Sequence, residues 1–316
     1  MKDDSNEILV QILRILDKAG FIVSEVDSDY CLEIVAKRGN VKLLIKTLEN
    51  VDNERKESAE DLHLLAATFS ASPLIIGSKV QRGVIEKDAL YERFGINVIS
   101  PKTFRNAALG GKFPSVYSKR GGLYFRIDGD ALRRLRRERG MSLGELANKI
   151  GVSRKAVYEY ENSQMGATLN TALRMEEVLN AGVTMDIDIF TWRCNEEPPE
   201  RSPAGVVAQQ LHNKLKEIGC KAIGFSYAPI DVHARNFGVS FLTNEKRLGE
   251  RALDRKVGDA LEVSKVLEIE PVLITGDVRP MGLNITILRI DDIRKLERLR
   301  DLERLLHLDV IDDADN

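Results

Sequence analysis

Near the middle of the chain, two cations directly follow a serine that lies two residues after a glycine. Ser153 stands two residues after Gly151, and Arg154 and Lys155 follow it. Serine at such a place can accept a hydrogen bond from the open amides of a new helix, and glycine frees the backbone to turn left. A helix that opens with Arg-Lys and is tightly joined to the helix before it suits insertion into the DNA major groove. These residues therefore predict a helix pair that presents hydrogen-bond donors to a nucleic acid.

The elements that must position this pair lie between Ala131 and Leu179, where the spacing predicts four short helices. Ser142 and Glu145 have the spacing of a capping box before the second helix, Ser153 caps a third over 154–162, and Thr168 caps the fourth. The residues expected to face inward are Leu143, Leu146, Ala147 and Ile150, then Ala156, Val157 and Tyr160, and finally Leu169, Leu173, Val178 and Leu179. A helical bundle that touches no DNA would show the same apolar pattern.

The run resembles the Cro/cI-type helix-turn-helix, also called the XRE family, which has a lambda-repressor-like helical fold. The matching segments are an arginine-rich first helix, Met141-Ser142, Glu145-Leu146-Ala147, Gly151-Val152-Ser153 and Tyr160-Glu161-Asn162. The resemblance implies a structural pair between Arg136 and Glu161. The family usually has glycine where Ser163 stands, so we expect a looser exit from the third helix.

The same resemblance implies which residues contact DNA. The DNA-binding set would be Ser142, Leu143, Ser153, Arg154, Lys155, Tyr158 and Glu159. Arginine and lysine donate to guanine, and glutamate can accept from cytosine. Tyr158 could contact a thymine methyl group or a sugar, or simply cover the helix surface. The candidate phosphate contacts are Arg133, Arg137, Lys119, Arg120 and Asn162, although the arginines of the first helix could equally form a solvated basic face.

A stretch without acidic residues, 101–127, directly precedes the helices. Its cations are Lys102, Arg105, Lys112, Lys119, Arg120 and Arg126. The net charge of the chain is only -2, so any surface for nucleic acid must be local. Residues 116–118 and 123–125 are β-prone and flank Lys-Arg-Gly-Gly, which predicts a hairpin with a basic tip. The hairpin could be a wing on the DNA backbone or a brace between domains.

Composition bounds the class of protein. A chain of 316 residues has room for two or three domains. It has no run of eighteen apolar residues and no basic-then-apolar amino end, so we expect a soluble, cytoplasmic protein with no membrane contact. The cysteines and histidines are scattered, which excludes an obvious zinc site, and we expect neither metal nor cofactor: Cys31, Cys194, Cys220, His63, His212, His233 and His307.

The flanks contain a weak internal repeat. Position 32 corresponds to position 230, a shift of 198 residues that aligns 32–37 with 230–235 and 73–76 with 271–274. Each copy reads as a helix, two strands, a long helix, a strand, and then a strand and helix. At this low identity, two unrelated α/β segments could show the same similarity by chance.

This order, with a carboxylate on one strand and a lysine on the next, resembles the restriction-endonuclease-like fold of nucleases and Holliday-junction resolvases. The fold implies a D...ExK motif that holds Mg²⁺ through paired carboxylates. Glu33 and Lys46 match two members, but Leu44 stands at the second acid. In the second copy Asp231 remains, while the other two positions hold Leu242 and Asn244. We therefore expect degenerate, non-catalytic lobes with no catalytic residues.

The predicted fold class is α/β plus all-α, with a central lambda-repressor-like helical domain between two related α/β lobes. The expected segments are an α/β lobe at 1–108, a basic linker or β-hairpin at 109–127, a helix-turn-helix domain at 128–182, a strand and acidic proline-containing linker at 183–201, and a second α/β lobe at 202–316. A carboxyl-terminal amphipathic helix around Ile293–Leu306 would pack on its own lobe or form a dimer contact.

The whole arrangement resembles a group of archaeal helix-turn-helix transcriptional regulators. The resemblance implies no particular ligand or target. Because one helix-turn-helix reads only a few base pairs, we expect a sequence-specific regulator that binds double-stranded DNA as a homodimer on a palindromic site, with an unknown effector and no enzymatic activity. Two alternatives stay open: a metal-dependent nuclease or Holliday-junction-resolvase-like enzyme targeted by the helices, and an antitoxin-like or scaffold DNA-binding protein.

Overall fold

The computed structural model describes residues 2–81, 83–119, 122–192, 197–244, 250–275 and 284–306. Contacts divide the chain into two compact units. The first unit comprises Met1–Phe21, Ile45–Glu54 and Ser72–Trp192, and the second comprises Ile22–Leu44, Arg55–Ala71 and Arg193–Asn316. Strand β3 (Val41–Asn50) therefore contributes residues to both units.

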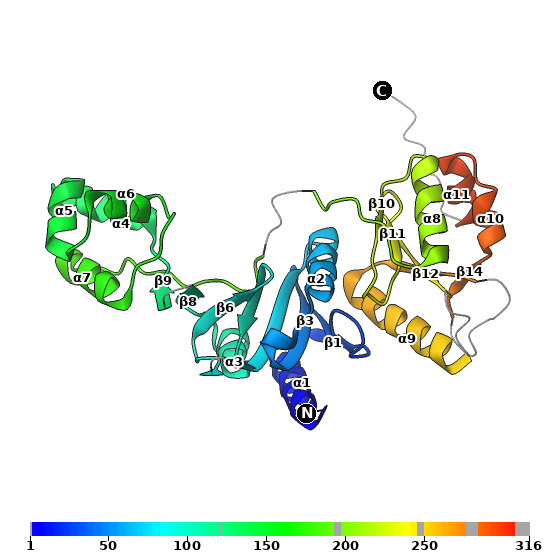
Figure 1. Cartoon of the computed structure of the whole chain (residues 1–316), viewed down its shortest axis with the longest axis horizontal. Helices are drawn as coiled ribbons and strands as arrows, with labels where there is room; N and C mark the ends of the chain where they lie inside the picture. Colours follow the sequence, from blue (N-terminus) through cyan, green and yellow to red (C-terminus); the bar gives the residue numbers. More distant parts are fainter. Residues whose placement is uncertain are drawn as a thin grey trace. The chain divides into compact units, whose positions relative to one another are not determined.

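The first unit combines a mixed sheet with a run of helices near the middle of the sequence (Figure 1). Its helices are α1 (Lys2–Lys18), the 3-10 helix η1 (Val51–Asn53), α3 (Pro101–Gly110), α4 (Gly129–Glu138), α5 (Leu143–Ile150), α6 (Arg154–Glu161) and α7 (Leu169–Leu179). Its strands besides β3 are β4 (Ser72–Val80), β5 (Gly83–Val84), β6 (Ala89–Arg93), β7 (Ile96–Ile99), β8 (Val116–Lys119) and β9 (Gly122–Phe125).

The strands of the first unit follow the order β3-β4-β7-β6-β8-β9, with β5 paired to β4. β4 runs parallel to β7, and β6 is antiparallel to β7 and parallel to β8. Leu74, Ile75 and Ile76 of the central strand β4 are fully buried, as expected for a strand that is covered on both faces. The sheet is thus a well-packed part of the first unit.

The predicted hairpin is present as β8 and β9, which pair antiparallel from Val116↔Phe125 to Lys119↔Gly122. Pairing of Ala89 with Val116 adds the hairpin to the sheet. On the other side, Phe125 and Ala167 exchange two backbone hydrogen bonds of 2.7 and 3.0 Å. The hairpin therefore braces the helices against the sheet.

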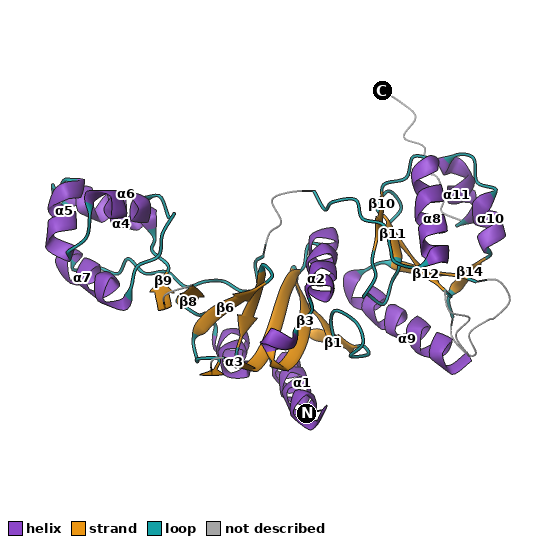
Figure 2. Cartoon of the chain, in the orientation of Figure 1, coloured by secondary structure: helices purple, strands orange, loops and turns teal. Residues whose placement is uncertain are grey.

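Helices α4 to α7 form a helical module with its own apolar core. Figure 2 shows the four helices and the loops that join them. The predicted interior of the second and third helices is confirmed, with Leu143 and Ala156 packed at its edge. The prediction for the fourth helix is partly wrong, because Leu169 and Leu173 are 53% and 55% exposed. The buried stripe of α7 is instead Ala172, Met175 and Leu179. Both stripes have helical spacing, so the periodicity alone could not choose between them.

The strand predicted near Val183–Ile189 does not form. Only the isolated bridge Ile127↔Thr184 is present there. The segment is nevertheless held by backbone hydrogen bonds from Met185 to Arg126 and from Ile187 to Pro114, of 3.0 and 2.7 Å. These bonds are too widely spaced for a regular β-ladder. The alternation of apolar and polar residues over 183–189 therefore reflects the packing of an extended segment and not a strand. Of the predicted acidic, proline-containing linker, residues 195 and 196 lie outside the described residues, and residues 197–200 form no helix or strand.

The second unit contains parts of both α/β lobes. Its helices are α2 (Lys56–Phe69), α8 (Val206–Glu217), α9 (Glu250–Leu267), α10 (Ile290–Arg294) and α11 (Leu299–Leu305). Its strands besides β3 are β1 (Ile22–Glu25), β2 (Ile34–Arg38), β10 (Ala222–Gly224), β11 (Val232–Ala234), β12 (Val239–Thr243), β13 (Glu270–Ile274) and β14 (Thr286–Leu288).

The internal repeat corresponds to a repeated topology. In the second lobe the strand order is β10-β11-β12-β13-β14, and in the first lobe the equivalent strands follow the order β1-β2-β3-β4-β7. The shift of 198 residues places the start of β2, Ile34, on Val232, the start of β11, and Val41 of β3 on Val239 of β12. Neither β1 nor β10, the first strand of each copy, was predicted from the sequence. Strands of three or four residues show too little alternation to be recognised.

The carboxyl-terminal helix is two short helices, α10 and α11, rather than one. Ile293, Leu296, Leu302 and Leu306 are buried in the core of the second lobe together with residues of α8. These residues therefore pack on their own lobe. Across the described part of the chain, no helix combines the length and apolar character needed to cross a membrane.

Candidate DNA-binding site

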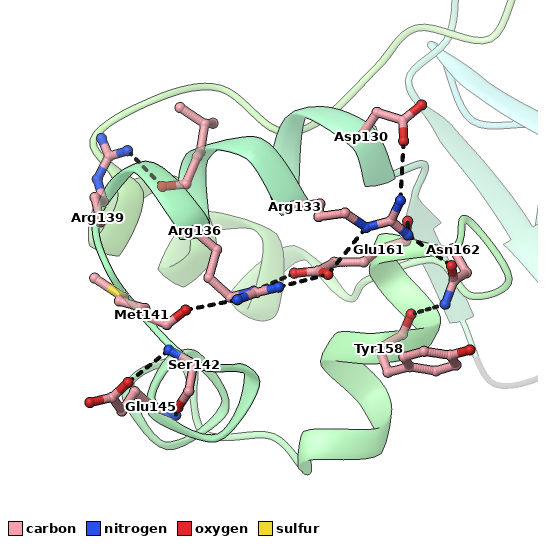
Figure 3. A network of polar contacts seen from close by, with 11 residues as sticks. Asp130, Arg133, Arg136, Arg139, Met141, Ser142, Glu145, Tyr158, Glu161 and Asn162 are labelled. Carbon is pink, nitrogen blue, oxygen red and sulfur yellow. Dashed lines mark hydrogen bonds and ion pairs between the residues drawn. The ribbon is translucent and has the colours of Figure 1, made fainter.

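Helix α5 begins with a complete capping box (Figure 3). The Ser142 hydroxyl accepts a hydrogen bond from the Glu145 amide at 3.2 Å, and the Glu145 carboxylate accepts one from the Ser142 amide at 2.7 Å. These hydrogen bonds hold the pKa of Glu145 below its usual value. The start of α5, and with it Leu143, is therefore fixed in place.

A tight turn joins α5 to α6. Gly151 has a φ of +75°, in the left-handed region that glycine adopts without strain, and its amide donates to the Ala147 carbonyl at 2.9 Å. Ser153 then caps α6 by accepting from the Ala156 amide at 3.0 Å. Both predictions from the sequence are confirmed, and together they set the direction of α6.

Helix α6 has a buried face and an exposed face. Val157, Tyr160 and Glu161 are buried. Ser153, Arg154, Lys155 and Tyr158 are exposed, and Glu159 is half-buried beside them. The Lys155 ammonium lies 3.7 Å from the Glu159 carboxylate, one helical turn away. The predicted reading residues therefore share one accessible surface with Ser142 and the partly buried Leu143.

The implied pair between Arg136 and Glu161 is present and buried (Figure 3). Arg136 donates to both carboxylate oxygens, with Nη2 3.0 Å from Oε2. Hydrogen bonding to Glu161 raises the pKa of Arg136. The pair links α4 to the end of α6.

Two of the five candidate phosphate contacts are engaged within the module. Arg133 donates to the Glu161 carbonyl at 3.0 Å and to the Asn162 side chain at 2.8 Å, and Asn162 donates to the Tyr158 carbonyl at 2.8 Å (Figure 3). Arg137 and Lys119 are exposed, and the Lys119 ammonium lies 5.3 Å from the ring centre of Tyr117. Arg120 lies outside the described residues.

The exit from α6 runs through Ser163, whose φ is +55°. This is the left-handed region where a side chain is strained and where glycine is favoured. The departure from the family pattern therefore has a conformational consequence at this position.

Two stabilising contacts of the module were missed in the sequence. Arg139 donates to the Leu179 carbonyl at the end of α7. Glu176 accepts from the Val183 amide at 3.1 Å and from the Thr184 hydroxyl at 2.9 Å. Burial by itself would raise the pKa of Glu176, but these hydrogen bonds outweigh it and the pKa is lowered. The first contact joins residues 40 positions apart, and the second joins α7 to the irregular segment that follows it, so neither has the spacing of a helix cap or a turn.

Among the described residues, the nuclease-like positions supply one carboxylate in each lobe, Glu33 and Asp231, which is fewer oxygen ligands than Mg²⁺ takes. Glu33, Lys46 and Leu44 are all buried. In the second lobe, Asp231 accepts hydrogen bonds from the Thr243 amide at 2.6 Å and from the Lys256 ammonium at 2.7 Å. Lys256 thus neutralises the charge of this carboxylate. Among the described residues, no group of three or more histidine, cysteine or acidic side chains could hold a metal ion.

Two family models match consecutive segments of the chain. A model described as a PD-(D/E)XK superfamily domain matches residues 5–114, and a model described as helix-turn-helix matches residues 132–184. The fold class is thereby confirmed as an α/β nuclease-type fold followed by a helix-turn-helix domain. The first match names a fold used by nucleases, whereas the second covers the capped helix pair.

Several archaeal proteins are similar to most of this chain. A protein of Thermococcus gammatolerans named "Putative HTH-type transcriptional regulatory protein" is 35% identical over 263 residues, which cover 83% of each chain. One of the same name from Methanothermobacter thermautotrophicus is 36% identical over 86% of each chain. A similarly named protein of Thermococcus kodakarensis is 31% identical and covers 96% of this chain and 95% of its own. The similarity thus extends across both lobes and the helical module.

Proposed function

The chain belongs to this archaeal family of HTH-type transcriptional regulatory proteins, and we propose from that premise that it is a sequence-specific DNA-binding regulator acting as a homodimer. Double-stranded DNA is the partner. The α/β lobes supply dimerisation, further DNA contacts or effector sensing.

The observation that supports this function is the exposed face of α6. Its two adjacent cations, Arg154 and Lys155, project from the first turn of a helix whose other face is buried. Arginine and lysine there can donate to guanine O6 and N7 in the major groove, and Glu159 can accept from cytosine N4. Ser142, Ser153, Leu143 and Tyr158 complete the proposed contact surface.

Phosphate contacts would position the module without sequence preference. We assign this role to Arg137 and Lys119, which are exposed, and to Arg120 of the hairpin tip. Arg133 and Asn162 hydrogen-bond one another and the end of α6, so we assign them to bracing that helix.

A homodimer follows from the small footprint of one module. One helix-turn-helix contacts only a few base pairs, and two copies related by a two-fold axis read an inverted repeat with half-sites about one helical turn apart. Selection of bound fragments from the organism's own genome should therefore return an inverted motif, and light scattering should give twice the mass of the chain.

The test of the reading helix uses the selected site and the full chain. Arg154→Ala with Lys155→Ala should weaken binding to that site at least tenfold in a gel-shift titration, because guanine contacts are lost. A matched control is Arg294→Ala with Lys295→Ala, which removes an adjacent exposed Arg-Lys pair elsewhere and should leave binding unchanged. Unchanged binding by the first variant would show that α6 is not the reading helix.

A second candidate function is a nuclease, because the family model over residues 5–114 describes a PD-(D/E)XK domain. Its test is Mg²⁺- or Mn²⁺-dependent cleavage of duplex, branched and single-stranded DNA. The nuclease function would be established by cleavage that is abolished both by Glu33→Gln and by Lys46→Ala. If none of these substrates is cleaved, the nuclease function is rejected and the regulator remains as the proposed function.

A further inference from the structure

A small notch lies on the exposed side of the helix pair. Its volume is 330 Å³, and it is lined by Leu143 from the start of α5 and by Arg154, Lys155 and Tyr158 from α6. Two of its walls are therefore apolar, an isobutyl group and an aromatic ring, and two are the stems of cationic side chains.

The two apolar walls are held on fixed backbone. Leu143 is the first residue of α5, directly after the capping box, and it packs on the edge of the module core. Tyr158 follows Arg154 by four residues, so the two side chains share one face of α6. The Tyr158 carbonyl accepts from the Asn162 amide and side chain at 3.1 and 2.8 Å. The tight turn at Gly151 fixes the separation of the two helices and so the width of the notch.

Of the four bases, only thymine offers an apolar group, the C5-methyl, to the major groove. Adenine and cytosine present amino donors there, which would face the cations of Arg154 and Lys155. Guanine presents two acceptors, and these would lose hydrogen bonds against Leu143 and the Tyr158 ring. A methyl group against these walls removes apolar surface from water without leaving a polar group unpaired.

We propose that the notch receives the 5-methyl group of a thymine, adjacent to a guanine contacted by Arg154 or Lys155. The inference rests on the proposed function and adds the identity of one base to it. Leu143 and Tyr158 then determine specificity through shape, while the cations determine it through hydrogen bonds.

The test replaces single thymines of the selected site by deoxyuridine, which removes the methyl group and keeps base pairing. At one thymine of each half-site, next to a guanine, binding should weaken roughly fourfold per half-site. The other thymines should tolerate the change. If deoxyuridine at every thymine leaves the affinity unchanged, the proposal is overturned.

Protein variants locate the methyl group in the notch. Leu143→Ala and Tyr158→Ala should each weaken binding to the thymine site and abolish the difference between thymine and deoxyuridine. Tyr158→Phe keeps the ring and should keep that difference. Leu173→Ala removes an exposed leucine outside the notch and should change neither value. A thymine preference that survives both alanine variants would place the methyl group elsewhere.

The two levels of the argument fail separately. Loss of selected-site binding in the Arg154 and Lys155 variant, together with indifference to deoxyuridine, would refute the notch and keep the regulator. Absence of any selected site would instead refute the proposed function itself.

Discussion

Arg136 of α4 and Glu161 of α6 form a buried ion pair that joins the first helix of the module to the helix with the exposed cations. Their side chains are 10% and 5% exposed. Arg136 also donates to the Met141 carbonyl at 2.7 Å, so one guanidinium holds α4, the loop before α5 and the end of α6 together (Figure 3). The orientation of the proposed reading helix therefore depends on a contact on its opposite face.

Loss of this pair should destabilise the module. Arg136→Met leaves the Glu161 carboxylate buried with only Arg133, 3.5 Å away, and we expect a loss of about 3 kcal/mol. Arg136→Met with Glu161→Leu removes both charges of the pair and should recover much of that loss. Hydrogen exchange of the α6 amides measures both. A double variant as unstable as the single one would contradict this account.

Gly129 should not tolerate a methyl group. A Cβ at this position would lie 2.5 Å from the Glu161 carbonyl oxygen, which is backbone and cannot move aside easily. We expect Gly129→Ala to lower the free energy of unfolding by about 1–3 kcal/mol. Gly144→Ala is the control, since its nearest neighbour is 3.9 Å away, and it should gain up to about 1 kcal/mol. Urea unfolding followed by circular dichroism would compare them, and equal effects would be evidence against the close approach of α4 and α6.

Ser163→Gly should stabilise the chain. The left-handed backbone at Ser163 costs a residue with a Cβ about 1 kcal/mol, and glycine avoids that strain. Ser163→Ala is the matched control, because it removes the hydroxyl and keeps the Cβ, and it should bring no gain. Thermal unfolding of the three proteins gives the comparison. A gain in the alanine variant equal to that in glycine would assign the effect to the hydroxyl.

Arg137→Gln should reduce the salt dependence of DNA binding. Each phosphate contact contributes about −0.9 to the slope of log affinity against log salt concentration. Loss of one contact per subunit should therefore make the slope shallower by about 0.9 for each subunit. The change should be the same on the selected site and on random duplex, because a phosphate carries no sequence. An unchanged slope would leave Arg137 on a solvated face.

Asp259→Asn should change how stability depends on pH. Burial and the neighbouring Asp27 carboxylate raise the pKa of Asp259 to about 6. The folded state therefore binds a proton at Asp259 more tightly than the unfolded state does, so the contribution of this group to stability is fully present below pH 4 and is lost as pH rises through 6. Asparagine stays neutral, so the variant should be more stable than the parent at pH 7.5, by about 1 kcal/mol because solvent screens this half-exposed group. The two proteins should converge at pH 4; a constant difference would contradict the assignment.

Several elements of the site could be predicted because their causes are local. The Ser142 and Ser153 caps, the turn at Gly151 and the hairpin each depend on residues within a few positions of one another. The pair of Arg136 and Glu161 came from family resemblance, because its members are 25 residues apart. Two predictions failed although the residues had the expected periodicity. Leu169 and Leu173 have helical spacing but are exposed on α7, and residues 183–189 alternate like a strand but form none.

The amino-acid order alone therefore decided which segments form the helix pair and which cations open its second member, since caps, turns and periodicity act over single turns of chain. Tertiary packing decided the rest. It brought Leu143 and Tyr158 from two helices to one notch, turned Arg133 and Asn162 towards each other, and paired Asp231 with Lys256. Such contacts depend on how buried surfaces fit together, and residue spacing carries no information about that fit.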